Sequence, residues 1–174
     1  MPTRHKDIPS NTRLHISPLP DDPQPTKTIQ VVRLHPAARL PQRKTEGAAC
    51  FDLFTVENIV IPPAEVSTSA YPVRTGLSVA IPEGYHMKIF LRSSAGLNSR
   101  LRLANQTGII DSDYRGEVFL IIENYGFAPF NVPTGTRIAQ CLIERNIPVV
   151  FEEVDELEMT MRGAGGFGST GGAV

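Results

Sequence analysis

The sequence predicts an all-β fold, either a sandwich or a barrel, and three observations support this prediction. Short apolar or alternating runs rich in Val, Ile and Phe recur from residue 29 onward, and these residues suit a pleated sheet. Turn signals containing Pro or Gly separate the runs at short intervals. The runs do not alternate with long helical patterns, which disfavours a doubly wound fold. Strands of about four to eight residues at such spacing are typical of sandwiches and barrels.

Eight runs are expected to form strands. In chain order they read IQVVRLH, FDLF, NIVI, GLSVAI, HMKIFL, EVFLIIEN, RIAQCLIE and PVVFEEV. Turns are expected at Pro62-Pro63, at residues 82–84, at Tyr125-Gly126 and at residues 133–135. One modest helix is expected at residues 94–102, where a weak helical period appears. The predicted domain is therefore made of strands with a single short helix.

Composition divides the chain into three parts. Residues 1–28 contain six prolines and few apolar residues, so we expect a disordered extension; the alternative is a docking arm for a partner. Residues 29–151 carry the predicted β core. Residues 152–174 begin with an acidic linker and end in a glycine-rich arm that cannot fold on its own.

The overall charge narrows the classes of partner. Lys plus Arg number 17 and Asp plus Glu number 18, giving a net charge of −1. This balance provides no excess of positive charge that would indicate binding to duplex nucleic acid or to an anionic membrane. Binding of phosphate groups would therefore require positively charged side chains gathered at one site. The chain has no apolar run of roughly 18 residues and no hydrophobic signal core at its start. We expect a protein that is not secreted and is cytoplasmic, or intracellular in a host if viral.

The two cysteines, Cys50 and Cys141, each lie in an apolar run. Such cysteines are usually small buried thiols, and this is the prediction for both. The four histidines are scattered and no CxxC occurs, so neither a zinc site nor a disulfide framework is expected.

The segment GIIDSDYRGEV, residues 108–118, carries the strongest chemical signal. Asp111 and Asp113 flank Ser112, and Tyr114 follows. The segment could be only a charged turn between strands, a common use of Asp, Ser and Gly. In the functional interpretation one carboxylate is a general base that takes a proton from water. Tyr114 would then offer a flat face to a sugar or base.

Three other segments carry candidate site residues. In LRSSAGLNSR, Arg92 precedes two hydroxyls, and guanidinium with hydroxyl donors suits phosphate oxygens. In GTRIAQ, strand alternation predicts that Arg137 shares one face with Ala139, and Ile138 the other with Gln140, so the strand either leads to a site or is an ordinary edge. Asp52 lies in an apolar strand and must find a hydrogen-bonding partner or a metal shell.

The arm RGAGGFGSTGG places an Arg, a Phe and a Ser-Thr pair among glycines. Its backbone N–H groups could wrap an anion, although no GxxxxGK[ST] phosphate loop is present. In their order and spacing, these five segments resemble the five motifs of the trimeric dUTPase (dUTP nucleotidohydrolase) family. The resemblance covers roughly residues 29–172, and GIIDSDYRGEV and RGAGGFGSTGG are its most specific parts.

The resemblance implies a distorted β jelly roll and a homotrimer with three shared active sites. It implies hydrolysis of dUTP to dUMP and pyrophosphate, with Mg²⁺ held through substrate phosphates and waters. Asp111 would deprotonate the attacking water, and Tyr114 would pack on the deoxyribose and exclude a 2′-hydroxyl. A β-hairpin would read the uracil edge through Asn105, Gly108, Ile109 and Ile110, with Phe119 contacting the base through its backbone.

The resemblance also assigns the phosphate contacts. Arg92, Ser93, Ser94 and Gln140 would hold the phosphates, with Asp52 near the metal and the phosphates but not bound to the metal. Ser94 replaces the glycine and Leu91 the proline that are usual in the family. In the arm, Phe167 would stack on uracil and Arg162 would pair with the γ-phosphate. Gly168, Ser169 and Thr170 would add further donors.

Two other functions stay open. A dCTP deaminase of the same fold would use a Glu near the base and lack the aromatic glycine-rich arm, which Asp111 and Phe167 disfavour. A regulatory protein could keep the fold and bind a partner through the proline-rich start of the chain. The intact motif positions argue against loss of catalysis.

Overall fold

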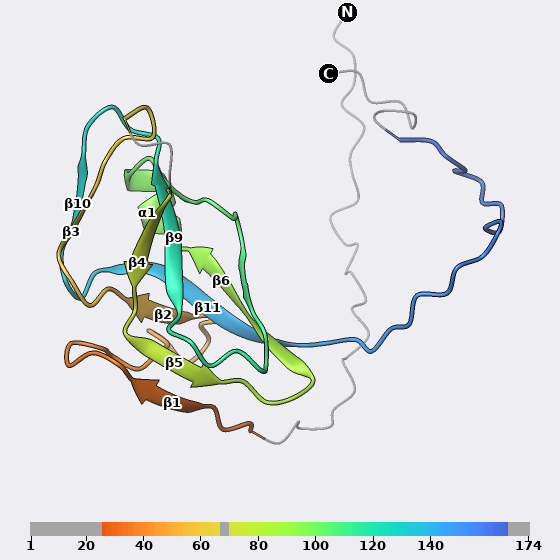
Figure 1. The fold of residues 1–174 in the computed structure, drawn as a ribbon, viewed down its shortest axis with the longest axis horizontal. Helices are drawn as coiled ribbons and strands as arrows, with labels where there is room; N and C mark the ends of the chain where they lie inside the picture. The colour runs from red at the N-terminus through yellow and green to blue at the C-terminus, as the bar shows by residue number, and fades with distance from the viewer. Residues whose placement is uncertain (1–25, 67–69, 167–174) are drawn as a thin grey trace, which may run out of the picture.

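The computed structural model describes residues 26–66 and 70–166, and within them it confirms the predicted all-β class (Figure 1). The proline-rich extension lies almost wholly outside these residues, as does the arm beyond residue 166. The described elements are β1 (Gln30–Arg33), β2 (Phe51–Phe54), β3 (Ile59–Ile61), β4 (Tyr71–Arg74), β5 (Leu77–Ala80), β6 (Tyr85–Leu91), α1 (Ser93–Asn98), β7 (Leu101–Leu103), β8 (Gly108–Ile110), β9 (Phe119–Asn124), β10 (Phe130–Val132) and β11 (Arg137–Arg145).

The strands form two main antiparallel sheets. One has the order β2-β11-β6-β8 and the other β4-β9-β7, and two-stranded pairs β1-β5 and β10-β3 complete the body. In Figure 1, β4 and β9 cross over the line of β2 and β11, so the sheets pack as layers. Fully buried side chains from both sheets, such as Ile89 and Ile122, belong to one core. Burying each such side chain contributes about 1.5–3 kcal/mol.

Strand β9 shows how alternation builds both a core and a cavity wall. Leu120 and Ile122 are fully buried, because alternate residues of a strand point to opposite faces. Phe119 and Ile121 point the other way and are partly exposed. The outward face of β9 is therefore apolar, and it lines the cavity described below.

The predicted helix at residues 94–102 is too long. The helix α1 ends at Asn98, and residues that follow form β7, which pairs with β9. Leu101 and Leu103 are buried while Arg102 is exposed, so pairing against the core at a period of two overrides the weak helical pattern. No helix of the described residues is long and apolar enough to cross a membrane.

The predicted alternation in GTRIAQ is also wrong. A β-bulge lies between Arg137 and Ala139 where β11 pairs with β2. Because a bulge inserts an extra residue, alternation breaks there, and Ile138 and Ala139 are both buried. Regular strand pairing resumes after the bulge, and Gln140 lies opposite Asp52 on β2.

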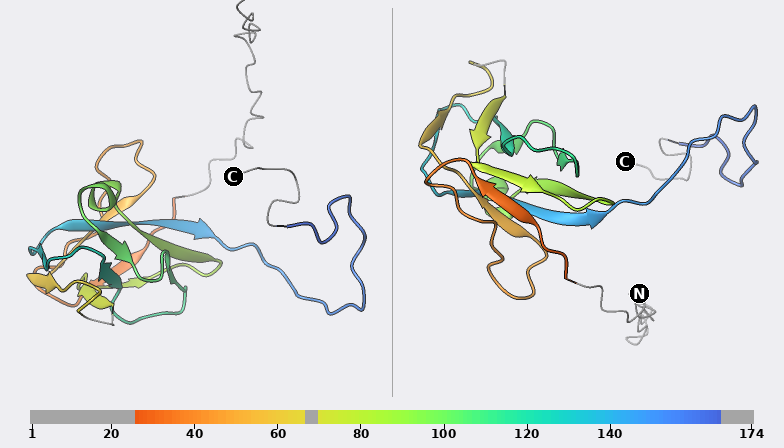
Figure 2. Two further views of the ribbon diagram at one scale, coloured as in Figure 1. Left: turned by 90° about the horizontal axis from the view of Figure 1, so that it is seen from above. Right: turned by 60° about the horizontal axis from the view of Figure 1, so that its bottom comes forward.

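The predicted strand PVVFEEV does not form in the single chain. Residues 146–160 carry no strand, and Val150 and Phe151 are 94% and 97% exposed. The segment leaves the body after β11 and runs away from the sheets in every view (Figure 2). A strand needs a neighbour for its backbone hydrogen bonds, and the described chain provides none beside this segment.

The cysteines differ from one another. Cys141 on β11 is buried, as predicted, and burial raises the pKa of its thiol to about 12. Cys50, at the edge of β2, is only half-buried, so the prediction of full burial was too strong. Both thiols are free.

Candidate active site

A cavity of about 300 Å³ gathers the residues predicted to contact base, sugar and water. It is lined by Asn105, Gly108, Ile109, Ile110, Asp111, Tyr114 and Phe119, together with Ile89, Leu103, Glu117 and Ile121. These residues come from β6, from β7 and the turn after it, from β8 and the loop that follows it, and from β9. Segments of separate sheets thus supply one concave surface with an amide, backbone groups, an aromatic ring and a carboxylate.

The predicted hairpin of the base site takes a different form. The strand β7 pairs with β9, whereas β8 pairs with β6, so the turn between β7 and β8 crosses from one sheet to the other. Gln106 adopts a left-handed conformation in this turn, with φ of 59°. A Cβ on Gly108 would lie 3.2 Å from the Cβ of Ile89. Glycine therefore lets β8 approach β6 closely and leaves its outer face open to the cavity.

Tyr114 stands at the mouth of the cavity, where its ring is partly exposed. Its hydroxyl donates a hydrogen bond of 3.0 Å to the carbonyl of Glu117. The ring lies directly over Gly116, where a Cβ would overlap the ring and the hydroxyl. Two independent features, one hydrogen bond and one close approach, therefore define the position of the ring.

Asp111 begins the loop at residues 111–118 and is exposed at the cavity wall. The backbone N–H of Tyr114 donates to the Asp111 carbonyl at 3.3 Å, which closes a turn. Arg115 folds back onto the same turn and donates to the carbonyls of Ser112 and Tyr114. Asp113 is exposed too but does not line the cavity, so geometry distinguishes the two carboxylates. Of the two carboxylates, Asp111 is therefore the one that lines the cavity.

The β4–β5 connection anchors the second half of this loop. Ser78 Oγ donates to the Arg115 carbonyl at 2.7 Å, and Thr75 Oγ1 to the Val118 carbonyl at 2.6 Å. Between these, the side chain of Glu117 binds Arg74. Sequence reasoning missed this ion pair, since the two residues are 43 positions apart and neither belongs to an alternating pattern that would predict the contact.

A second polar cluster lies at one end of the four-stranded sheet. Asp52 is only 8% exposed. Its Oδ2 accepts a hydrogen bond from Arg137 Nη1 at 2.8 Å, and its Oδ1 forms an ion pair with Arg92 Nε, also at 2.8 Å. Arg92 Nη1 also donates to the Arg137 carbonyl at 3.1 Å. Gln140 lies opposite Asp52 across the β2–β11 pair. The structure therefore brings together three predicted phosphate-site residues and adds Arg137, whose place in GTRIAQ was the only signal available from the sequence.

Two arginines satisfy the buried carboxylate of Asp52. An unpaired buried charge would be costly, and removing one partner of such a pair destabilises strongly. A guanidinium carries five N–H donors, so each arginine has more donors than this cluster uses. Ser93 and Ser94 are exposed at the start of α1, directly after Arg92.

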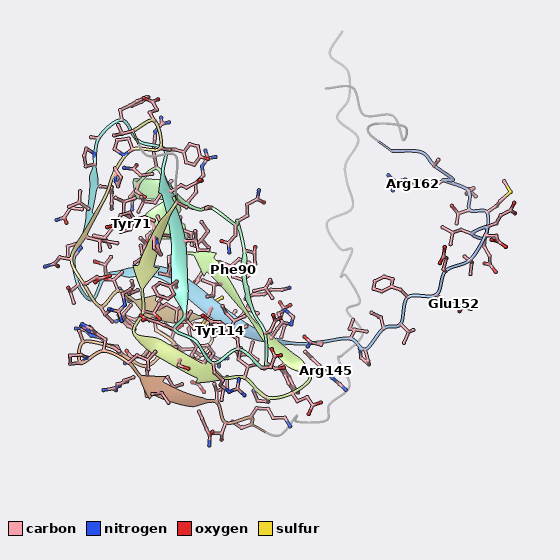
Figure 3. All side chains as sticks on the ribbon, in the orientation of Figure 1. Tyr71, Phe90, Tyr114, Arg145, Glu152 and Arg162 are labelled. Atoms are coloured by element: carbon pink, nitrogen blue, oxygen red, sulfur yellow. The ribbon has the colours of Figure 1, made fainter. Side chains whose placement is uncertain are left out.

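The cavity and the Asp52–Arg92–Arg137 cluster are separate features of one chain. Among the described residues, the cavity lining does not include Arg92, Ser93 or Gln140, while Ser94 and Arg137 line another hollow of about 220 Å³. In Figure 3, Arg162 lies on the C-terminal segment, well away from Tyr114 on the body. Arg162 Nε donates to the Gly165 carbonyl at 2.9 Å. The remaining predicted arm residues, Phe167, Gly168, Ser169 and Thr170, lie outside the described residues.

The fold and the cavity define an all-β protein that offers hydrogen-bonding groups, an aromatic face and a carboxylate to a small polar ligand. A sequence model of the dUTPase family matches residues 37–171. The chain therefore belongs to the dUTPase family.

Curated relatives agree with this assignment. The chain is 43% identical over 143 residues to the deoxyuridine 5′-triphosphate nucleotidohydrolase of Wolinella succinogenes, covering 82% of this chain and 93% of that protein. It is 39% identical over 143 residues to the enzyme of the same name from Helicobacter pylori strain J99, covering 82% of this chain and 96% of that protein.

Solved structures agree as well. The dUTPase of Staphylococcus bacteriophage 80alpha, solved with dUpNHpp, superposes with a TM-score of 0.75 at 28% identity, covering 84% of this chain and 99% of that chain. A dUTPase of phage phi11 of S. aureus, solved with a structural Mg(II) ion, gives 0.68 at 25% identity, covering 76% of this chain and 100% of that chain. The family and the general fold predicted from the motifs are thus confirmed.

Proposed function

We propose that this chain hydrolyses dUTP to dUMP and pyrophosphate. The observation that carries the proposal is that Asn105, Asp111 and Tyr114 line one cavity in a chain of the dUTPase family. The reaction would keep uracil out of DNA and supply dUMP for dTMP synthesis. A cytoplasmic location belongs to the same proposal.

The cavity would recognise the base by hydrogen bonding and the sugar by shape. The Asn105 amide and the backbone of residues 108–110 would read the uracil edge, with the backbone of Phe119 beside them. A cytosine amine would leave buried donors mismatched, and such mismatches give strong discrimination. The ring of Tyr114 would pack on the deoxyribose and leave no space for a 2′-hydroxyl.

The chemical step would be in-line attack of water on the α-phosphorus. Asp111 takes one proton as the water oxygen bonds to phosphorus. The bond from the α-phosphorus to the bridging oxygen breaks, and pyrophosphate leaves with that oxygen. Arg92, Ser93, Ser94 and Gln140 would hold the phosphates in line and offset their charge.

Mg²⁺ would bind the triphosphate oxygens and neutralise charge on the leaving group. The described residues hold no group of three or more His, Cys, Asp or Glu that could cage a metal ion. Both oxygens of Asp52 are occupied by guanidiniums, so this residue would act on the phosphate site through Arg92 and Arg137. This donor set fits an ion that keeps its waters and is held mainly by the substrate.

We infer that the active enzyme is a homotrimer with shared sites. The support is that the Asp52–Arg92–Arg137 cluster, which we call the phosphate cluster, contributes no residue to the cavity lining of its own chain, and that the apolar segment around Phe151 is exposed. Neighbouring copies would bring a phosphate cluster and a C-terminal arm to each cavity. Arg162 would then reach the γ-phosphate and Phe167 the uracil ring, with Gly168, Ser169 and Thr170 closing on the phosphates.

A pyrophosphate-release assay with dUTP, dTTP, dCTP and UTP, with and without Mg²⁺, tests the activity. We expect fast release from dUTP with Mg²⁺ and little from the others. Ammonia release from dCTP would instead identify a deaminase. Light scattering tests assembly, and an active monomer would disprove the shared site.

A further inference from the structure

The side chain of Glu117 is held more firmly than its position in a loop would suggest. Its Oε2 accepts from Arg74 Nη2 at 2.8 Å, and Arg74 Nε lies 3.1 Å from both carboxylate oxygens. The backbone N–H of Gly76 donates to Oε1 at 2.8 Å. The side chain of Glu117 is 11% exposed and that of Arg74 is 35% exposed. The hydrogen bonds and charge of Glu117 raise the pKa of Arg74 above its ordinary value.

The backbone of the same residue holds Tyr114. The carbonyl of Glu117 accepts the hydrogen bond of the Tyr114 hydroxyl. For the described residues, this is the only side-chain hydrogen bond that the structure gives for Tyr114. A displacement of the backbone at residue 117 would therefore move the acceptor that sets the height of the ring.

We propose that Glu117 is a positioning residue for selection of deoxynucleotides: its ion pair with Arg74 fixes the carbonyl that holds the Tyr114 ring against the sugar. The proposal rests on the proposed dUTP hydrolysis, since it assigns the ring to the deoxyribose. Glu117 lines the cavity but acts here through Tyr114. A bidentate ion pair suits this task because it fixes orientation as well as distance.

The competing explanation is that the pair only stabilises the fold. A partly exposed ion pair usually contributes little to stability, because solvent screens it. More importantly, the two explanations differ in what they do to selectivity. Loss of folded protein lowers the rates for dUTP and UTP by the same factor, whereas a displaced ring changes their ratio.

The first test is Glu117→Gln, which keeps the shape but removes the charge. In one preparation, kcat/KM is measured for dUTP and for UTP, with a UTP inhibition constant where UTP turnover is too slow. We expect the dUTP-to-UTP preference to fall about tenfold, since misplacing a positioning group by a fraction of an ångström costs roughly this much. Arg74→Gln removes the same ion pair from the other side and should give the same change. An unchanged preference in both variants would overturn the proposal.

The matched control is Glu144→Gln, which breaks the ion pair between Glu144 on β11 and Lys88 on β6; neither residue lines the cavity or contacts Tyr114. It should leave the preference unchanged. A fall in the control as large as in Glu117→Gln would show that any lost ion pair has this effect, and would also overturn the proposal.

A double-mutant cycle with Tyr114→Phe tests the route through the hydroxyl. If Glu117 acts through that hydrogen bond, Glu117→Gln should lower the preference much less in the Phe background than in the wild type, because coupled substitutions are not additive. Additive effects would refute the route. Wild-type protein without dUTP turnover would instead reject the proposed function, whereas an active wild type with additive variants rejects only the positioning role.

Discussion

The loop at residues 111–118 and the segment at residues 147–166 both carry motif residues, but among the described residues only the loop is bound to the rest of the body by side-chain hydrogen bonds and an ion pair. The loop is tied to the β4–β5 connection by the side chains of Thr75 and Ser78 and by the Arg74–Glu117 pair. The described part of the C-terminal segment makes only local hydrogen bonds, such as that from Gly165 N to the Arg162 carbonyl. Figure 2 shows the segment running away from the body in both views.

This difference separates two tasks. A site that selects base and sugar benefits from groups fixed before the ligand arrives, because ordering them on binding would cost affinity. A lid must open to admit substrate and release product, so its structure is gained on closure. Selectivity should therefore depend on the loop, and turnover should depend on both regions.

The largest expected effect is in the loop. Asp111→Asn should lower kcat by at least about a hundredfold, because an amide cannot take the proton from water. Nucleotide binding, measured by calorimetry with a non-hydrolysable dUTP analogue, should change little. Asp113→Asn is the matched control, since Asp113 belongs to the same turn but does not line the cavity. Near-normal turnover in Asp111→Asn, or an equal loss in the control, would refute the base assignment.

The second effect tests the C-terminal segment. A chain ending at Met161 lacks the glycine-rich arm and should lose roughly tenfold to a hundredfold in kcat, the range in which positioning and exclusion of water act. Its sheets should remain folded, as judged by circular dichroism, because the described residues beyond 146 make no hydrogen bond to the body. Deletion of residues 1–25 is the control at the other end and should keep turnover within about twofold. Full activity of the chain ending at Met161 would show that the arm is no lid.

A smaller effect is expected under Tyr114. Gly116→Ala would place a methyl group where the ring and hydroxyl now lie, so the ring must move. We expect KM for dUTP to rise by a factor of about three to ten, with kcat affected less. Gly47→Ala is the control, because no atom lies within 4 Å of a Cβ there. Equal KM values for the two variants would mean that the ring position does not matter for binding.

Sequence predictions were confirmed where the local pattern alone determines the element, and were wrong where contacts between distant segments determine it. Local alternation predicted strands such as β6 and β9, and the turns at Gly84 and Gly135 have the positive φ that such turns require. Pairing between distant strands determined the other elements. The end of the predicted helix at residues 94–102 instead forms part of β7, because β9 lies beside it and pairs with it. The segment after β11 has no neighbouring strand among residues 26–66 and 70–166.

The candidate site divides in the same way. The motifs predicted seven of the eleven residues that line the cavity, because a turn between strands brings neighbours in sequence to one surface. Contacts between distant segments could not be predicted from the sequence. Arg137 pairs with Asp52 across 85 positions and Arg74 with Glu117 across 43, and no periodicity of a single sequence encodes such a partner.

The smallest expected effect concerns whether the folding of the β-sheet body depends on the C-terminal segment at residues 147–166. Cys141 lies on β11, the strand that continues into the C-terminal segment, and burial raises the pKa of its thiol to about 12. At pH 8 only about one native thiol in ten thousand would be ionised, and the pathway for a reagent is closed as well. We expect Ellman's reagent to label the half-buried Cys50 in minutes and Cys141 only after unfolding. The chain ending at Met161 should behave identically.

The same thiol gives a pH test with a defined sign. The folded chain holds the Cys141 proton more tightly than the unfolded chain, so the free energy of unfolding should fall as the pH rises from about 9 towards 12, by up to about 1.4 kcal/mol per pH unit. Cys141→Val should flatten this slope in chemical denaturation measured between pH 8 and 10. In the labelling experiment with Ellman's reagent, rapid labelling of Cys141 in the chain ending at Met161, but not in the full chain, would show that the C-terminal segment stabilises β11. The body and the segment would then fold as one unit, and closure of the arm would depend on the sheet that carries Asp52 and Gln140.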